Sequence, residues 1–150
     1  MKKYTLNFGE FKQFDKVFLT AEKGIDGASV TSVAFCGEAL YIATAKGSFE
    51  YNNGGLKKLS FSANKFFSAD GNLYSAAGNN LYQVKNGKAK KIAEFDSPVI
   101  DISVALDKSL WLITEEALFL SENGEFKQIV ELPSETVCLA ALDNKAKYAE

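Results

Sequence analysis

The feature that most constrains this fold is a repeat, which recurs at offsets of 33 and 37 residues and keeps three anchors in register. The first anchor is a leucine followed by an aromatic residue. A glycine follows the aromatic after thirteen positions, and a branched aliphatic residue follows the glycine after five. The anchors are Leu40-Tyr41, Leu73-Tyr74 and Leu110-Trp111; Gly54, Gly87 and Gly124; and Leu59, Ile92 and Ile129. Such a repeat indicates stacked structural units, none of which buries its apolar faces alone.

Each unit is predicted to form four short strands, and the third unit shows the pattern most clearly. Runs rich in β-branched and aromatic residues cover residues 99–106, 110–114, 117–121 and 126–131. Asn123-Gly124 separates the last two runs, and this dipeptide favours a type I′ hairpin because both central residues of that turn need positive φ. Four-stranded antiparallel units of about 40 residues are typical of β-propeller blades. The aromatic residue after each leucine is therefore predicted to pack between blades.

The sequence thus predicts an all-β chain, a single β-propeller domain over residues 1–150 made of four-stranded antiparallel blades. The repeat units cover approximately residues 30–64, 65–98 and 99–136. Residues 1–20 and 137–150 are predicted to form a partial blade. The reason is that "GEFKQF" at 9–14 nearly repeats "GEFKQI" at 124–129, so the first residues resemble the third and fourth strands of a blade. The expected N-terminal strands are residues 4–8 and 11–20.

Three arrangements of the ends fit this pattern. The two partial blades can combine within one chain, which gives about four blades, three whole and one split between the termini. Two chains can instead pair their ends into an eight-bladed ring, as a homodimer. The chain can also be a fragment or half of a larger propeller. In each case an open stack must hide its terminal strand edges and apolar faces, because these promote aggregation.

The repeat units resemble a known family, the two-component-regulator propeller repeats of bacterial sensor proteins. The matching segments are "LYIATAKGSFEY" and "LWLITEEALFL", each with a leucine-aromatic strand that ends in threonine. The resemblance covers roughly residues 30–129, and Glu115-Glu116-Ala117 stands where the family usually has a glycine. It implies a recognition platform of the kind found in sensors and names no ligand.

The composition excludes several classes of function. The chain has no His and no Arg, and its 17 basic residues are all lysine. The usual general base, the commonest metal ligand and bidentate guanidinium recognition are therefore missing. With a net charge of −2, a nucleic-acid partner is not expected. Cys36 and Cys138 form no metal-binding or redox motif and are predicted to be reduced, buried thiols in strands. No cofactor and no metal are expected.

No apolar run approaches the length of a membrane span, and the N-terminus lacks the hydrophobic region of a signal peptide. A membrane association is thus not expected, and the sequence as it stands predicts a cytoplasmic protein. A mature secreted domain with an added methionine has the same appearance.

Candidate ligand-binding residues lie in the loops that a propeller presents on one face. These loops are the connections between blades and the turns between the second and third strands of each blade. The candidates are Asp26, Lys46, Asn79, Asn80, Glu115 and Glu116. No residue is assigned to catalysis.

The first functional hypothesis is a non-catalytic propeller module that recognises a protein or carbohydrate ligand through this loop face. The alternative is an accessory or catalytic propeller of a glycan-degrading enzyme, either a glycosidase or a lyase. In that enzyme Glu115 and Glu116 would supply the paired carboxylates that glycoside hydrolysis requires. The missing histidine and arginine weigh against catalysis, so the chain is more consistent with a binding module.

Overall fold

The computed structural model describes residue 25 and residues 28–122, 124–133, 135–142 and 145–149. This part of the chain is all-β, with three four-stranded antiparallel sheets and one two-stranded sheet. Blade 1 contains β1 (Val30–Cys36), β2 (Ala39–Thr44), β3 (Gly47–Asn52) and β4 (Gly55–Lys58); blade 2 contains β5 (Lys65–Ala69), β6 (Asn72–Ala77), β7 (Asn80–Lys85) and β8 (Lys88–Glu94); blade 3 contains β9 (Val99–Val104), β10 (Leu110–Thr114), β11 (Ala117–Glu122) and β12 (Glu125–Glu131); and the half-blade contains β13 (Cys138–Leu142) and β14 (Lys145–Ala149). The prediction of an all-β propeller with four-stranded antiparallel blades is confirmed.

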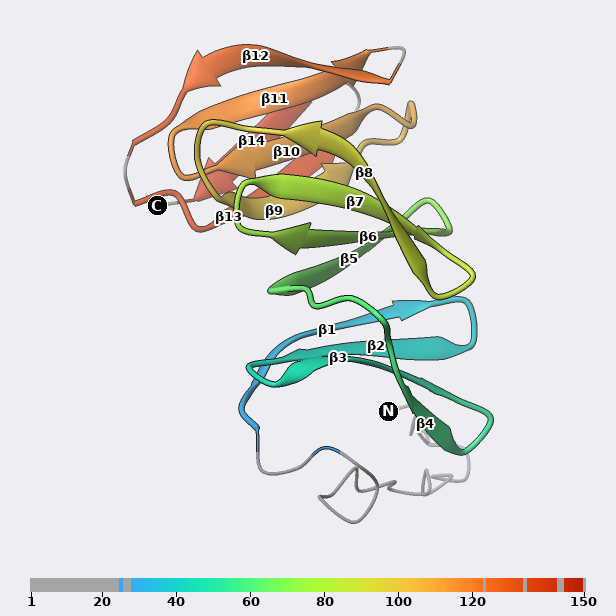
Figure 1. Ribbon diagram of the computed structural model, residues 1–150. Coiled ribbons are helices and arrows are strands. Elements are labelled where there is room, and N and C mark those ends of the chain that lie inside the picture. Colours follow the sequence, from blue (N-terminus) through green and yellow to red (C-terminus); the bar gives the residue numbers. More distant parts are fainter. Residues whose placement is uncertain (1–24, 26–27, 123, 134, 143–144, 150) are drawn as a thin grey trace, which may run out of the picture.

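Within every blade the strands follow one another in sequence order, so each blade is a simple meander. Figure 1 shows the blades stacked face to face, from the blue and teal strands of blade 1 through green blade 2 to the yellow and orange strands of blade 3. The first strands of successive blades are neighbours: β1 contacts β5, β5 contacts β9, and β9 contacts β13. The described blades therefore form an open stack with the first strands along its inner side.

The turns between third and fourth strands have the conformation that Asn-Gly predicts. Asn53 and Gly54 have φ values of 48° and 76°, and Asn86 and Gly87 have values of 51° and 70°. Positive φ at both central residues is the mark of the type I′ turn, which gives the strand pair its right-handed twist. The repeated glycine is therefore a requirement of the turn.

Three apolar clusters hold the stack together, and each lies between two neighbouring blades. The first joins blades 1 and 2, where the rings of Tyr41 and Phe66 lie 5.8 Å apart. The second joins blades 2 and 3, and the third joins blade 3 to the half-blade. Trp111 belongs to the third cluster and is only 6% exposed. The prediction that the aromatic after each leucine packs between blades is confirmed at this joint.

Polar side chains connect the inner strands, because these strands do not form a backbone ladder with one another. Each bond joins a side chain of one first strand to a backbone group of the next. The bonds link Ser32 Oγ to the Phe66 N–H (3.1 Å), Lys65 Nζ to the Ile100 carbonyl (2.8 Å), Asp101 Oδ2 to the Leu139 N–H (3.0 Å) and Ser103 Oγ to the Ala141 N–H (3.1 Å). Backbone groups that an edge strand leaves open are thus satisfied across the joint.

Three predictions about individual segments need comment. The prediction of two buried thiols is wrong, since Cys36 is half-buried and Cys138 is exposed, although both lie in strands and are free. Cys138 is exposed because it lies on β13, beyond which no blade is stacked in the described part of the chain. The first strand of blade 3 ends at Val104, two residues earlier than predicted. The N-terminal strands expected at residues 4–8 and 11–20 lie outside the described residues.

Candidate binding groove on the loop face

The turns between second and third strands lie beside the connections that enter each blade. In blade 1, the Ala45 N–H donates to the Ser29 carbonyl over 3.3 Å. In blade 3, the Glu115 N–H makes the equivalent bond to the Pro98 carbonyl over 3.1 Å. These two loop types therefore share one face of the stack, as the sequence predicts for a propeller.

A buried threonine at the end of the second strand organises the turn in blades 1 and 3. Thr44 Oγ1 accepts the Lys46 N–H over 3.2 Å and donates to the Gly47 carbonyl over 2.8 Å. Thr114 Oγ1 accepts the N–H groups of Glu116 and Ala117, over 3.3 and 3.1 Å. Both threonines are at most 5% exposed. The hydroxyl satisfies backbone groups that the turn would otherwise leave unpaired.

Blade 2 has Ala77 at the threonine position and uses asparagine side chains instead. Asn64 Oδ1, from the connection between blades 1 and 2, accepts the Gly78 N–H over 2.9 Å. Asn79 Nδ2 donates to the Asp96 carbonyl over 3.1 Å, and the Asn79 carbonyl accepts the Phe95 N–H over 3.0 Å. Asn79 therefore fixes the connection between blades 2 and 3, which is a structural role.

The backbone of Glu115 and Glu116 is held on both sides. Besides the Pro98 bond and the Thr114 hydroxyl, the Glu116 carbonyl accepts the Leu132 N–H over 2.8 Å. The two side chains are exposed, while their backbone is tied to the connection that enters blade 3 and to the one that leaves it. A fixed backbone under two free carboxylates reduces the entropy that these groups lose when they bind a ligand.

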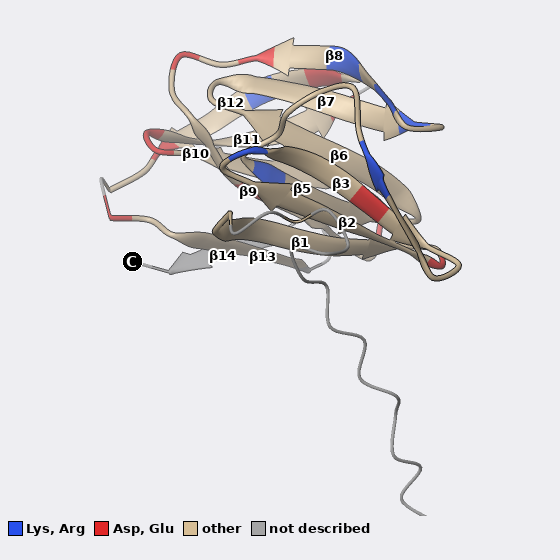
Figure 2. Cartoon of the chain, turned by 60° about the horizontal axis from the view of Figure 1, so that its bottom comes forward, with Lys and Arg blue, Asp and Glu red and all other residues tan. Residues whose placement is uncertain are grey.

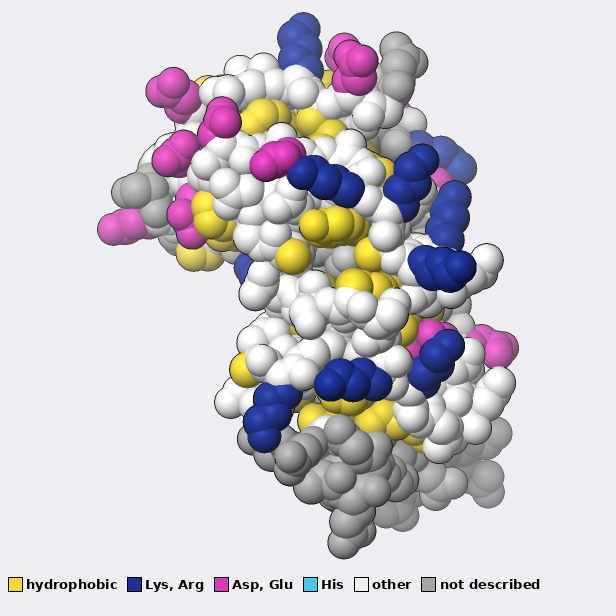
Figure 3. Space-filling model, viewed as in Figure 1, with side chains coloured by type: hydrophobic (Ala, Val, Ile, Leu, Met, Phe, Trp, Pro, Cys, Tyr) yellow, Lys and Arg dark blue, Asp and Glu magenta, His cyan; other side chains and the backbone are white. Residues whose placement is uncertain are grey.

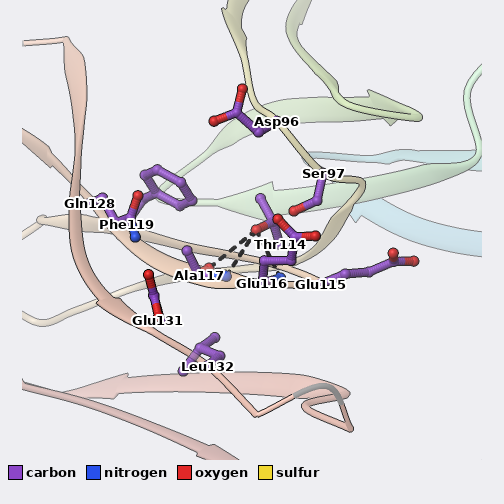
Figure 4. A pocket seen from close by; sticks show the side chains of 10 residues that line it. All are labelled: Asp96, Ser97, Thr114, Glu115, Glu116, Ala117, Phe119, Gln128, Glu131 and Leu132. Atoms are coloured by element: carbon purple, nitrogen blue, oxygen red, sulfur yellow. Dashed lines mark hydrogen bonds between the residues drawn. The ribbon is translucent and has the colours of Figure 1, made fainter.

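A hollow of about 450 Å³ lies beside this turn, and we call it the blade 3 hollow. Its lining consists of Asp96, Ser97, Thr114, Glu115, Glu116, Ala117, Phe119, Gln128, Glu131 and Leu132. Figure 4 shows Asp96 and Ser97 from the incoming connection on one side, and Glu131 and Leu132 from the outgoing strand on the other. The ring of Phe119 lies in between and is half-buried.

A second hollow, of about 310 Å³, continues the first along the seam between blades 2 and 3. The two hollows share Asp96 and Phe119. Phe95 underlies the seam and contacts Phe119 and Phe126 edge-on, with ring centroids 4.8 and 5.4 Å apart. Together the two hollows form a groove, which we call the blade 2–3 groove, with an aromatic floor and carboxylates along its rim.

The charge of the molecule changes along the stack of blades. Residues 99–136 contain eight carboxylates and two lysines, whereas residues 30–98 contain five carboxylates and eight lysines. Figure 3 shows the lysines over the lower and middle parts of the molecule and most acidic side chains over blade 3 at the top. In Figure 2 the acidic residues again gather at the turns of blade 3, while lysines line β8. The blade 2–3 groove therefore has a negative end.

The candidate residues from the sequence are thus distributed over several places. The structure brings Glu115 and Glu116 together in the blade 3 hollow. Lys46 lines a separate hollow between blades 1 and 2, with Thr44 and Asn64. Asn80 begins β7 and pairs with Glu94, so it is a strand residue. Asp26 lies outside the described residues.

Sequence reasoning missed Phe119, Gln128 and Glu131 as members of the hollow. A register shift between Leu118 and Phe119 sets Glu131 opposite Ala117, at the edge of the turn. The sequence signal was an acidic residue at the end of the fourth strand. That signal becomes specific only when the register of this strand pair is known.

Among the described residues, two tyrosines and one aspartate have shifted pKa values, and all three lie outside the groove. Burial raises the pKa of Tyr41, and the negative charge of Glu50 raises it further. Burial also raises the pKa of Tyr74. On the opposite face, hydrogen bonds from the Ser109 side chain and backbone lower the pKa of Asp107. None of these shifts is a sign of acid–base chemistry in the blade 3 hollow.

Among the described residues, no group of three or more Cys, Asp or Glu side chains is placed to hold a metal ion. That part of the chain also contains no helix that is long and apolar enough to cross a membrane.

No family model matches this sequence, and no curated protein matches it. Solved structures do match. The computationally designed Ika4 protein is 13% identical, with a TM-score of 0.66 over 89% of this chain and 92% of its own. The WD40 β-propeller domain of Doa1 is 17% identical, with a TM-score of 0.61 over 75% of this chain and 44% of its own. The extracellular domain of the hybrid two-component system BT3049 from B. thetaiotaomicron is 21% identical, with a TM-score of 0.59 over 74% of this chain and 17% of its own.

These similarities define the class of the protein as a β-propeller, or part of one, with about four blades. The neighbours include the sensor domains that the repeat sequence resembles. The chain spans less than half the length of the Doa1 domain and about a sixth of the sensor domain.

Proposed function

We propose that this β-propeller module is a non-catalytic recognition domain that binds a protein partner through the blade 2–3 groove. The observation that carries the proposal is the Glu115-Glu116 turn. Its carboxylates are exposed while its backbone is fixed by Pro98 and Leu132. Ligand-binding groups are commonly placed in this way, on a loop that a rigid scaffold positions.

The chemistry of the groove favours an extended basic segment of the partner. Carboxylates of Asp96, Glu116 and Glu131 border the blade 3 hollow, and Phe119 forms its floor. A lysine or arginine side chain would find both a negative rim and an aromatic ring for its aliphatic stem or its charge. The adjoining seam, with Ile92 and Phe126, would accept an apolar residue of the same segment.

The proposal is tested with a library of labelled peptides that alternate lysine or arginine with leucine or phenylalanine, and with acidic counterparts. The test variant is Glu115→Gln combined with Glu116→Gln. The matched control is Glu38→Gln combined with Glu122→Gln, which removes the same charge from exposed positions outside the blade 3 hollow. We expect basic peptides to bind the wild type and the control, and to bind the test variant about tenfold more weakly, which corresponds to about 1.4 kcal/mol.

Equal binding by the test variant and the control would contradict the proposed site. A glycan array and a turnover assay on the same proteins address the other hypotheses from the sequence. Binding of glycans in place of basic peptides would overturn the choice of a protein partner. Glycan cleavage that is lost in the test variant would overturn the non-catalytic assignment.

A further inference from the structure

We infer that a second copy of this chain covers the exposed outward side of β1 in blade 1, so that two chains close one ring of blades head to tail. The inference starts from β1, whose side chains Val33 and Phe35 are 58% and 67% exposed. Two large apolar residues on the outward side of one strand form a patch on which no described residue packs closely. The question is what kind of surface this patch is shaped to meet.

The repeat identifies the patch, because the residues equivalent to Val33 are covered in the other blades: Phe66 and Leu139 are buried and Ile102 is half-buried. Val33 and Phe66 have the same position in the repeat, because each pairs with the residue that follows the aromatic anchor of its blade. Val33 pairs with Ile42, and Phe66 pairs with Ser75. Phe66 is nonetheless only 4% exposed, because blade 1 covers it.

The half-blade gives the same result. Asp101 binds the Leu139 N–H as Ser32 binds the Phe66 N–H, so Leu139 has the position of Phe66 in its own blade. Leu139 is 8% exposed, because blade 3 covers it. By equivalence, Val33 is in the position that a preceding blade covers.

Such a face fits the side of a blade that is turned toward the following blade. The half-blade at the other end of the stack exposes this side, because no described blade follows it. Cys138 on β13 is exposed. Cys138 directly precedes Leu139 and therefore has the repeat position of Ser32 in blade 1 and Lys65 in blade 2. The side chains of Ser32 and Lys65 both form hydrogen bonds to the first strand of the next blade. Cys138 is therefore the residue of the half-blade that should face a following blade. The two free ends of one repeat protein are complementary by construction, since every internal joint already pairs these two kinds of face.

Curvature decides between one chain and two. Three quarters of this chain match 44% of the Doa1 propeller domain, so the described blades, with this rotation, turn through little more than half of a ring. A second half-ring of the same kind completes the circle.

The position of Ile25 supports this assembly. Ile25 is buried against Ile42 and Phe49 on the face of blade 1 that is turned away from blade 2. Phe95 is the equivalent residue for blade 3, because it lies 17 residues before Leu112, as Ile25 lies 17 residues before Ile42. Phe95 directly follows β8, the outer strand of the preceding blade. Ile25 therefore lies where the connection from a preceding blade would enter blade 1.

The first experiment measures mass by light scattering over a range of protein concentrations. We expect twice the 16.4 kDa of one chain. Val33→Asp combined with Phe35→Asp should give a monomer, while Leu106→Asp, at an exposed apolar residue outside the patch, should leave the dimer intact. Fluorescence of Trp111, which is buried at another joint, reports whether each variant keeps its blades folded. A monomeric wild type, or a dimer that survives the double aspartate change with intact Trp111 fluorescence, would overturn the inference.

A second experiment tests the direction of pairing. Val33→Cys in a Cys36→Ser background leaves Cys138 as the other thiol, and a short bismaleimide then links the two if they meet. A single band at twice the chain mass is expected, and Leu106→Cys in the same background should give none. A link that leaves the mass unchanged would show closure within one chain, a ladder would show open filaments, and no link would show that these faces do not meet. Each of these three results contradicts the two-chain ring.

Discussion

The second strands of blades 1 and 3 both end in a buried threonine, but the exposed turn residues that follow it carry opposite charges in the two blades. Thr44 and Thr114 bind the backbone of their turns in the same way. The exposed residues that follow are Ala45-Lys46 in blade 1 and Glu115-Glu116 in blade 3. The threonine and the backbone of the turn are therefore constrained by folding. The exposed side chains of the turn are not, so they can vary to suit a ligand.

The same two blades also differ in how they pack. Trp111 is buried between blade 3 and the half-blade, whereas Tyr41, its equivalent in blade 1, is only half-buried. A shared position in the repeat thus has a different energetic weight at each joint.

Replacing Trp111 by alanine should cost about 3–5 kcal/mol of unfolding free energy, the range for large aromatic residues in cores. The cavity would open among Ile113, Leu118 and Leu139. Tyr41→Ala should cost clearly less, because this side chain already has part of its surface in water. Urea unfolding followed by far-ultraviolet circular dichroism measures both. An equal loss for the two variants would show that the joints are equivalent after all.

Replacing Thr114 by valine should cost about 1–3 kcal/mol, because the N–H groups of Glu116 and Ala117 lose their acceptor inside the protein. Thr44→Val should also destabilise blade 1, but by less, since Thr44 accepts one N–H group, that of Lys46, where Thr114 accepts two. Thr114→Ser keeps the hydroxyl and serves as the control, again in urea unfolding. If only one of the two valine variants were destabilised, the shared scaffold of the turns would be refuted.

The smallest effect should appear only at alkaline pH, and in blade 1 rather than in blade 3, where tryptophan replaces the tyrosine. Tyr41 has its pKa raised above the ordinary value of 10.0 in the folded state, first by burial and then by Glu50. As the pH rises past 10, the unfolded chain releases this proton before the folded chain does, so stability present below pH 10 is lost. Tyr41→Phe should therefore lose less stability than wild type between neutral pH and pH 11. Parallel urea midpoints for the two proteins over this range would contradict the assignment.

Much of the fold was predictable from the sequence because local chemistry determines it. Asn53-Gly54 and Asn86-Gly87 form the expected turns, since few other dipeptides accept positive φ twice. The leucine-aromatic pairs mark the second strands correctly, because their residues alternate between the two faces of a blade.

The candidate site was predictable only in part. Glu115 and Glu116 follow a strand that the repeat locates, so their place on the loop face could be inferred. Phe119 and Glu131 reach the hollow through a register shift that depends on the packing of two strands. Asn79 is a polar loop residue by sequence, and only its bonds to the next connection reveal a structural role.

The side-chain bonds between inner strands span only 34 to 38 residues, and each blade contacts mainly the next. During synthesis, a blade can thus dock on its predecessor as soon as one further repeat has left the ribosome, without waiting for the C-terminus. Early docking shortens the time for which each apolar blade face is open to aggregation. The same short range allows a gene to gain or lose one repeat while every remaining joint keeps its partner, so blade number can change in evolution without redesign of the blade.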